Sequence, residues 1–134
     1  MFRVVFDTNV LVSGMVFAGK SKLLIDAVLE GTITLILSMP IIQEFRKVIA
    51  RDKFKLSKSQ QNTLSNFVLR IGNIVKIKSR FKVVKEDPSD DMVLRTAHDG
   101  EADYVVSGDE HLLVLMEFRG TKIITVSKML ELLR

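Results

Sequence analysis

Short apolar runs alternate with longer amphipathic stretches along this chain of 134 residues. The apolar runs are rich in β-branched and aromatic residues, which predicts buried strands at residues 2–6, 32–37, 103–106 and 122–126. Between them, apolar residues recur at helical spacing, which predicts helices at residues 22–30, 38–51, 58–71, 89–99 and 110–115 and a last one after Ser127. Strands that alternate with helices predict a single α/β domain, residues 1–134, whose parallel sheet is covered on both faces.

Small polar residues and glycines mark the predicted helix ends. A Ser side chain before a helix can accept a hydrogen bond from a free backbone N–H group, and a Gly after the helix can end it. The predicted caps are Ser21, Ser38, Ser57 or Ser59, Ser89 and Ser127, and the predicted stops are Gly31, Gly72 and Gly100.

Residues 74–85 alternate with period two instead, which predicts an extended segment with one apolar face. The other face carries a basic ladder: Lys76, Lys78, Arg80 and Lys82. The ladder could follow a phosphate backbone, or it could protect an edge strand from pairing with another chain. A second basic cluster could also bind phosphates and consists of Arg46, Lys47, Arg51, Lys53, Lys55 and Lys58.

Residues 14–21 match the phosphate-binding pattern GxxxxGK[ST] and precede a predicted helix. Such a loop wraps phosphates with its backbone amides, but here Met15, Val16 and Phe17 are bulky and apolar. We therefore interpret the stretch as an apolar loop that packs on the fold or on a second subunit, and we expect a homodimer that uses it. A nucleotide-binding loop is the weakest of the alternatives.

Composition narrows the class of protein. The lack of Cys excludes disulfides and thiolate metal sites, and the two histidines, His98 and His111, are assigned to the surface or to helix caps. The apolar runs are too short to cross a bilayer and residues 1–4 have no signal-peptide layout, so we expect a cytoplasmic protein without membrane contact. Lys and Arg outnumber Asp and Glu by 20 to 16, which suits a polyanionic substrate but also serves solubility.

Two acids lie at the carboxyl ends of predicted strands. Asp7 comes after the run Val4-Val5-Phe6, and Asp109 ends the stretch 104–109. The carboxyl ends of parallel strands meet at one edge of a sheet, where α/β folds place their ligands. Each acid could instead cap the segment that follows it, and for Asp109 the two roles are compatible. Ser107 could donate a hydrogen bond to a neighbouring carboxylate.

Two further acids lie on predicted helices. Asp90 falls inside the apolar stripe of its helix, so it points inward and needs a partner, with Asp91 and Asp87 as adjacent reserves. Glu44 falls at the edge of an apolar arc, where it could face a cleft or solvent. Acids gathered from distant parts of a chain repel one another, and a hard divalent cation would offset that repulsion. We therefore expect a metal-dependent enzyme that acts on phosphodiesters without a protein nucleophile.

Four stretches together resemble the PIN-domain family over nearly the whole chain, most closely its branch of toxins from type II toxin–antitoxin systems. They are residues 6–13, 42–44, 87–91 and 102–109. The resemblance implies a three-layer α/β/α sandwich, a Mg²⁺- or Mn²⁺-dependent endoribonuclease acting on single-stranded RNA, and an antitoxin as partner.

By motif position, the resemblance also implies roles for single residues. The catalytic and metal-binding acids would be Asp7, Glu44, Asp90 and Asp109, supported by Asn9 and Ser107. Asp91 stands where many relatives have a non-acidic residue, so the ligand at that point is left open between Asp90 and Asp91. RNA contacts are expected from Lys76, Lys78, Arg80, Lys82, Arg46, Lys47 and Arg51.

Two alternatives belong to other classes. A phosphatase of the haloacid dehalogenase type also begins with a strand and an Asp, but its motif requires a second Asp where this chain has Asn9. A non-catalytic RNA-binding or receiver-like module would keep the acidic pocket without turnover. Cleavage of RNA with Mg²⁺ would separate the enzyme from such a module.

Overall fold

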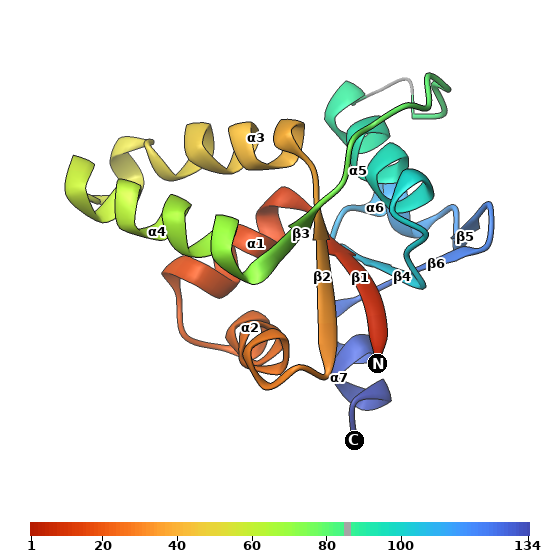
Figure 1. Ribbon diagram of the computed structural model, residues 1–134, viewed down its shortest axis with the longest axis horizontal. Helices are drawn as coiled ribbons and strands as arrows, with labels where there is room; N and C mark the ends of the chain where they lie inside the picture. The colour runs from red at the N-terminus through yellow and green to blue at the C-terminus, as the bar shows by residue number, and fades with distance from the viewer. Residues whose placement is uncertain (85–86) are drawn as a thin grey trace.

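A mostly parallel β-sheet runs through the centre of the molecule, with helices on both of its faces (Figure 1). The structure is a computed structural model that describes residues 1–84 and 87–134. Within that part, the strands lie in the order β3-β2-β1-β4-β6-β5. Their bounds are β1 Phe2–Phe6, β2 Ile33–Leu37, β3 Gly72–Ile74, β4 Tyr104–Val106, β5 Glu117–Phe118 and β6 Thr121–Ile124. The predicted α/β class and its parallel sheet are confirmed.

The chain changes direction across the sheet between β1 and β4. It builds β2 and β3 on one side of β1, then returns to place β4 against the other side and continues outward to β6. The strand β5, which the sequence did not predict, pairs antiparallel with β6 at the edge. Ligands of open α/β sheets bind at such a point of reversal, outside the carboxyl ends of the strands.

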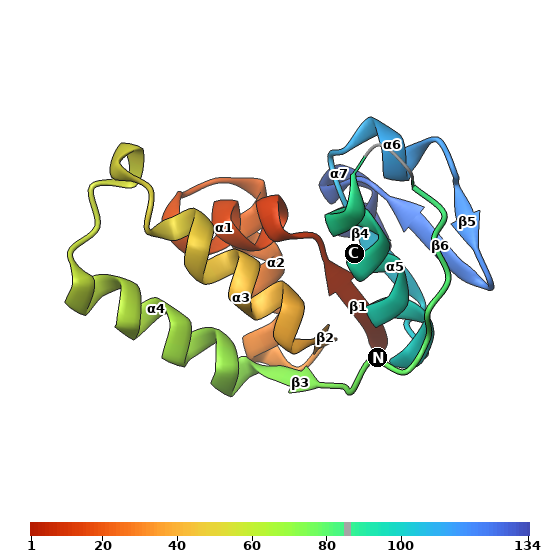
Figure 2. The same ribbon diagram turned by 90° about the horizontal axis from the view of Figure 1, so that it is seen from above.

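The helices fall into two groups around this sheet (Figures 1 and 2). The first four lie on one side and α5 lies on the other, while α7 packs against α2. Their bounds are α1 Thr8–Val16, α2 Lys20–Glu30, α3 Met39–Ile49, the 3₁₀ turn η1 Asp52–Phe54, α4 Lys58–Ile71, α5 Pro88–Asp99, α6 Glu110–Leu113 and α7 Val126–Leu132.

Helix α1 contradicts the predicted apolar loop. Its residues are buried on several sides, so no amphipathic period marked it as a helix. Gly14 lies inside α1, where an added Cβ would come within 2.8 Å of Ile25 Cγ1 and 2.9 Å of the Ser21 carbonyl oxygen. The glycine thus permits close packing of α1 on α2, and residues 14–21 do not form a phosphate-binding loop. Met15 and Val16 are half-buried against the core, which leaves Phe17 as the exposed residue of the three.

Three helix caps lie two residues before the predicted ones. The cap of α2 is Gly19 rather than Ser21, that of α5 is Asp87 rather than Ser89, and that of α7 is Thr125 rather than Ser127. Ser57 was right: its hydroxyl accepts from Gln60 N, and the Gln60 side chain accepts from Ser57 N. Asp87 and Thr125 outcompete the serines because each accepts a hydrogen bond from an N–H group of the first turn.

The segment after β3 is irregular rather than a strand. It is extended and has the predicted alternation of exposure over residues 75–83. Apart from Val75 N, which donates to the Leu37 carbonyl oxygen at 2.8 Å, its described residues form no backbone hydrogen bond with a strand; Lys85 lies outside the described residues. Side chains of α5 hold it instead. The Arg95 guanidinium donates to the carbonyl oxygen of Phe81 at 2.6 and 2.9 Å, and an Asp99 carboxylate oxygen accepts from Lys78 N and Ser79 N at 2.8 and 3.0 Å.

No helix in the described part of the chain combines the length and the apolar character that crossing a membrane requires.

Candidate active site

A cavity of about 220 Å³ opens at the carboxyl ends of β1 and β4, beside the point where the strand order reverses. It is lined by all four acids predicted from the sequence: Asp7, Glu44, Asp90 and Asp109. Asn9, Arg51 and Asp87 also line it. The fold therefore brings together side chains from the ends of two neighbouring strands and from two helices, α3 and α5.

Asp7 caps α1 and faces the cavity at the same time. Its Oδ1 accepts from Val10 N at 2.9 Å, and its Oδ2 accepts a short hydrogen bond from the Ser107 hydroxyl. The predicted hydrogen bond between Ser107 and a neighbouring carboxylate is thus present, and it joins the ends of β1 and β4. Asp7 is 6% exposed, so both bonds hold a buried carboxylate in one orientation.

Asp90 and Asp91 are adjacent and equally buried, but their surroundings differ. Asp91 Oδ1 accepts from the backbone N–H groups of Val83 and Val84 at 2.8 and 2.9 Å, so Asp91 anchors the irregular segment. Asp90 lines the cavity, and its buried Oδ2 has no hydrogen-bond partner among the described residues. A buried carboxylate oxygen without a partner is costly, which makes Asp90 the acid of this pair that a bound cation would stabilise.

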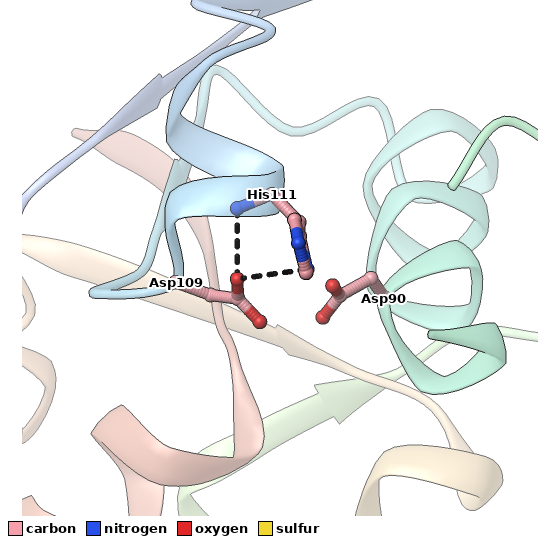
Figure 3. A group of neighbouring side chains, drawn as sticks. All are labelled: Asp90, Asp109 and His111. Atoms are coloured by element: carbon pink, nitrogen blue, oxygen red, sulfur yellow. Dashed lines mark hydrogen bonds and ion pairs between the residues drawn. The ribbon is translucent and has the colours of Figure 1, made fainter. Parts of the chain in front are cut away.

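Asp109 and His111 face Asp90 from the first turn of α6 (Figure 3). Asp109 Oδ1 accepts from His111 N at 2.8 Å and lies 3.7 Å from His111 Nδ1. One potential ligand atom from each of Asp90, Asp109 and His111 lies within 4.8 Å of the other two. His111 was assigned from the sequence to the surface or a cap, and it is exposed, yet the tight turn at Asp109 brings its ring to the rim of the site.

The acids disturb one another electrostatically. Burial, and repulsion from Asp109 and Asp87, raise the pKa of Asp90 to about 7. Burial also raises the pKa of Asp7, against the lowering effect of the hydrogen bonds from Ser107 and Val10. Within residues 1–84 and 87–134, no Lys or Arg forms an ion pair with the four acids. The site therefore concentrates acids that repel one another, which a bound cation would offset.

The donor set fits a divalent cation. Carboxylate oxygens are the ligands that Mg²⁺ and Mn²⁺ prefer, and an imidazole nitrogen is acceptable to Mn²⁺ and later transition metals. The unpartnered Oδ2 of Asp90 points to the same conclusion independently of the count of acids.

The remaining predicted residues lie in three places, because Arg46 and Lys47 are exposed on α3 and do not line the cavity. Arg51 lines the cavity, whereas the basic ladder lies on the segment held by Arg95. At 100° per residue, Arg95 is about 140° around α5 from Asp90, so the segment that carries the ladder lies against the face of α5 that points away from the cavity, with the ladder side chains exposed. Figure 2 shows α5 between that segment and α3.

A model of the PIN domain matches residues 3–111. The structure is similar to a chain in the crystal structure of VapBC2 from Rickettsia felis bound to a DNA fragment from their promoter. The TM-score is 0.65 at 12% sequence identity, over 92% of this chain and 98% of that one. At that identity the likeness concerns the fold. No curated protein sequence matches the chain.

Proposed function

Because this chain belongs to the PIN-domain family, we propose that it is a metal-dependent endoribonuclease that hydrolyses phosphodiester bonds of single-stranded RNA. The observation that carries the proposal is the unpartnered, buried Oδ2 of Asp90 in a cavity lined by three more acids. Such an arrangement has no structural benefit without a cation, because each acid raises the cost of ionising the others. Direct attack by water needs no protein nucleophile, which suits a cavity lined mainly by acids.

We assign Asp7, Asp90 and Asp109 to the cation and place Glu44 beside it, from the opposite wall of the cavity. When bound, Mg²⁺ or Mn²⁺ supplies Lewis acidity: it lowers the pKa of water and offsets negative charge on a phosphodiester. Ser107 fixes the orientation of Asp7, and Asp91 supports the site by fixing residues 83 and 84 beside α5. With a pKa near 7 before a cation binds, Asp90 can give up its proton on loading at neutral pH.

The protein's own polar groups would hold the substrate. Asn9 is exposed at the rim and can donate from its amide to a phosphate oxygen, and Arg51 can pair with a phosphate. Lys47 is exposed on α3 about 60° around the helix from Glu44 and can extend this basic wall, whereas Arg46 is about 160° from Glu44 and would contact only RNA that passes over α3. The basic ladder would contact only RNA that continues past the cavity and around α5, so we assign it the smaller share of binding.

We further propose that the protein is the toxin of a toxin–antitoxin pair in the cytoplasm, restrained by an antitoxin, and that it forms a homodimer. The fold similarity to a chain of VapBC2 supports the first part of this proposal. The dimer was predicted from the apolar residues Met15, Val16 and Phe17, of which only Phe17 is exposed.

Cleavage of a labelled single-stranded RNA by the purified protein tests the proposed activity. We expect cleavage with Mg²⁺ or Mn²⁺, none with a chelator, and none of a DNA strand of the same sequence. Asp7→Asn should fold and lose activity, and Asp26→Asn is the matched control because Asp26 lies on α2 in an exposed pair with Lys22. Cleavage that survives both the chelator and Asp7→Asn would refute the proposal.

A further inference from the structure

A second hollow, of about 290 Å³, adjoins the acidic cavity. The two share three lining residues, Asn9, Val48 and Arg51, so a ligand can extend from one into the other without leaving the surface. The second hollow lies where the end of α1 meets the end of α3 and the turn η1.

Two aromatic rings form one wall of this hollow. Phe17, the residue that ends α1, and Phe54, the last residue of η1, have ring centroids 5.9 Å apart at an interplanar angle of 49°. The Phe17 side chain is 54% exposed, although it follows a helix whose other large residues are buried or half-buried. An exposed ring beside a polar cavity is available for stacking, because Phe54 covers only part of it.

The charge of the second hollow is the reverse of the first. Its lining includes Arg51 and Lys53 and no acid. The ammonium of Lys53 also lies 5.1 Å from the centroid of the Phe54 ring. A hollow that combines aromatic rings with cations suits a nucleotide, whose base is flat and apolar on its faces and whose phosphate is anionic. By contrast, the lining of the hollow between α1 and α4 has no charged side chain.

We propose that this second hollow is a base-binding subsite: one unpaired nucleobase adjacent to the scissile phosphodiester stacks on Phe17. Arg51, which borders both hollows, pairs with the phosphate that joins that nucleotide to the reacting one. Lys53 adds attraction that does not depend on sequence. This subsite rests on the proposed nuclease function and deepens it, because it requires the substrate to be single-stranded at the nucleotide beside the cut: a paired base cannot reach the ring.

Binding without cleavage measures the subsite directly. In an Asp90→Asn background, the affinity of a short single-stranded oligoribonucleotide is measured by fluorescence anisotropy, together with a series that lacks one base at each position in turn. We expect one position at which base removal weakens binding by roughly 5- to 10-fold, at the low end of what loss of one base–aromatic stack causes. With Phe17→Ala, removal of the base should have the same effect on affinity at every position of the RNA, because the ring on which the base stacks is gone.

Variants of similar size separate stacking from general apolar contact. Phe17→Tyr should keep the position-dependent loss and Phe17→Leu should abolish it, while Leu29→Ala, exposed on α2, should change nothing. Equal affinities of Phe17→Leu and the parent protein would overturn the subsite. So would a flat series in the parent, or a change of sedimentation in Phe17→Ala without a change in RNA affinity, which would assign the surface to protein contacts. If the wild-type protein cleaves RNA but gives any of these results, the subsite is refuted and the proposed nuclease function is not. If the wild-type protein does not cleave RNA, both the nuclease function and the subsite are refuted.

Discussion

Asp90 and Asp91 are neighbours on α5, and each is 6% exposed, but they belong to opposite regions of the molecule. On the pocket face, which carries Asp90, the acid has an unpartnered oxygen and other acids around it. The packing face carries Asp91, Arg95 and Asp99. All three side chains are hydrogen-bonded to backbone groups of the segment 78–84. Burial alone therefore does not distinguish the two acids: Asp91 Oδ1 accepts two backbone hydrogen bonds, whereas Asp90 Oδ2 accepts none from the described residues, and this is why we propose Asp90 as the ligand.

The largest expected effect comes from removing a charge on the pocket face. Asp90→Asn should lower the rate of RNA cleavage by more than about 100-fold, since even partners of metal ligands cost 10- to 100-fold when replaced. In a chelator the same variant should melt at a higher temperature than wild type, because one source of repulsion is gone. Cleavage assays and thermal melting, each with and without metal, check both statements. A variant that loses activity and stability together would show that Asp90 is merely structural.

The opposite result is expected one residue further on. Asp91→Ala leaves the buried N–H groups of Val83 and Val84 without an acceptor, which should lower the free energy of unfolding by about 1–3 kcal/mol. Metal affinity, measured by calorimetry on folded protein, should stay within a few-fold of wild type. Urea denaturation gives the stability, with Asp26→Ala as the exposed control. If Asp91→Ala abolished metal binding and left stability intact, Asp91 would be the metal ligand and the roles given to Asp90 and Asp91 would be reversed.

The two faces should also respond to pH with opposite signs when no metal is present. The folded pKa of Asp90 is raised from 3.8 to about 7, so the folded state binds more protons than the unfolded state, and stability should fall as pH rises from about 4 to 7. For Asp99, burial opposes ionisation, but hydrogen bonds from Ser79 and Lys78 outweigh it and lower the pKa. Its contribution is present above 3.8 and is lost as pH falls through the lower folded value.

Denaturation curves from pH 3 to 8 in a chelator would reveal this contrast. Asp90→Asn should flatten the decline between about pH 4 and 7. Asp99→Asn should instead lower stability by a constant amount above pH 3.8 and have less and less effect as the pH falls below it, because the contribution of Asp99 is lost there. A wild type whose stability rose steadily from pH 4 to 7 would contradict the assignment of Asp90 as the strained group.

A smaller effect is expected from His111, at the edge of the pocket face. His111→Ala should weaken Mn²⁺ binding by about tenfold, the low end of the range for groups that support a metal. Mg²⁺ binding should change less, because Mg²⁺ prefers oxygen ligands to imidazole. Calorimetric titration with each metal checks the difference, and His98→Ala is the control because His98 packs its ring against Phe81 on the packing face. Equal losses for the two metals would exclude His111 as a ligand.

The smallest effect concerns RNA affinity. Arg51→Ala should reduce the slope of log affinity against log salt by roughly one unit, as expected for one lost phosphate contact on a single strand. Lys76→Ala with Lys78→Ala, on the far side of α5, should change the slope less for a short RNA. Anisotropy titrations over a range of NaCl concentrations measure both. A larger change from the ladder than from Arg51 would place the RNA along the packing face.

Sequence patterns predicted the parts of this molecule in which one local rule decides the outcome. Apolar strands followed by Asp7 and Asp109 gave the sheet edge and two of the acids, because parallel strands end at the same side. Helix α1 was missed because contact on several sides leaves no amphipathic period. Asp90 and Asp91 could not be separated, since the N–H groups that satisfy Asp91 lie in an irregular segment. His111 escaped notice because only the turn after Asp109 brings its ring toward Asp90.

The hydrogen bond between Ser107 and Asp7 spans 100 positions of the chain. A ribosome adds about 5–20 residues per second, so Asp7 emerges well before its partner and waits several seconds for β4. Contacts of such long range also form late when a domain folds, because the intervening chain must first give up its freedom. A chain that ends before Asp109 therefore has no complete acidic pocket. The proposed site can form only after β4 has been synthesised.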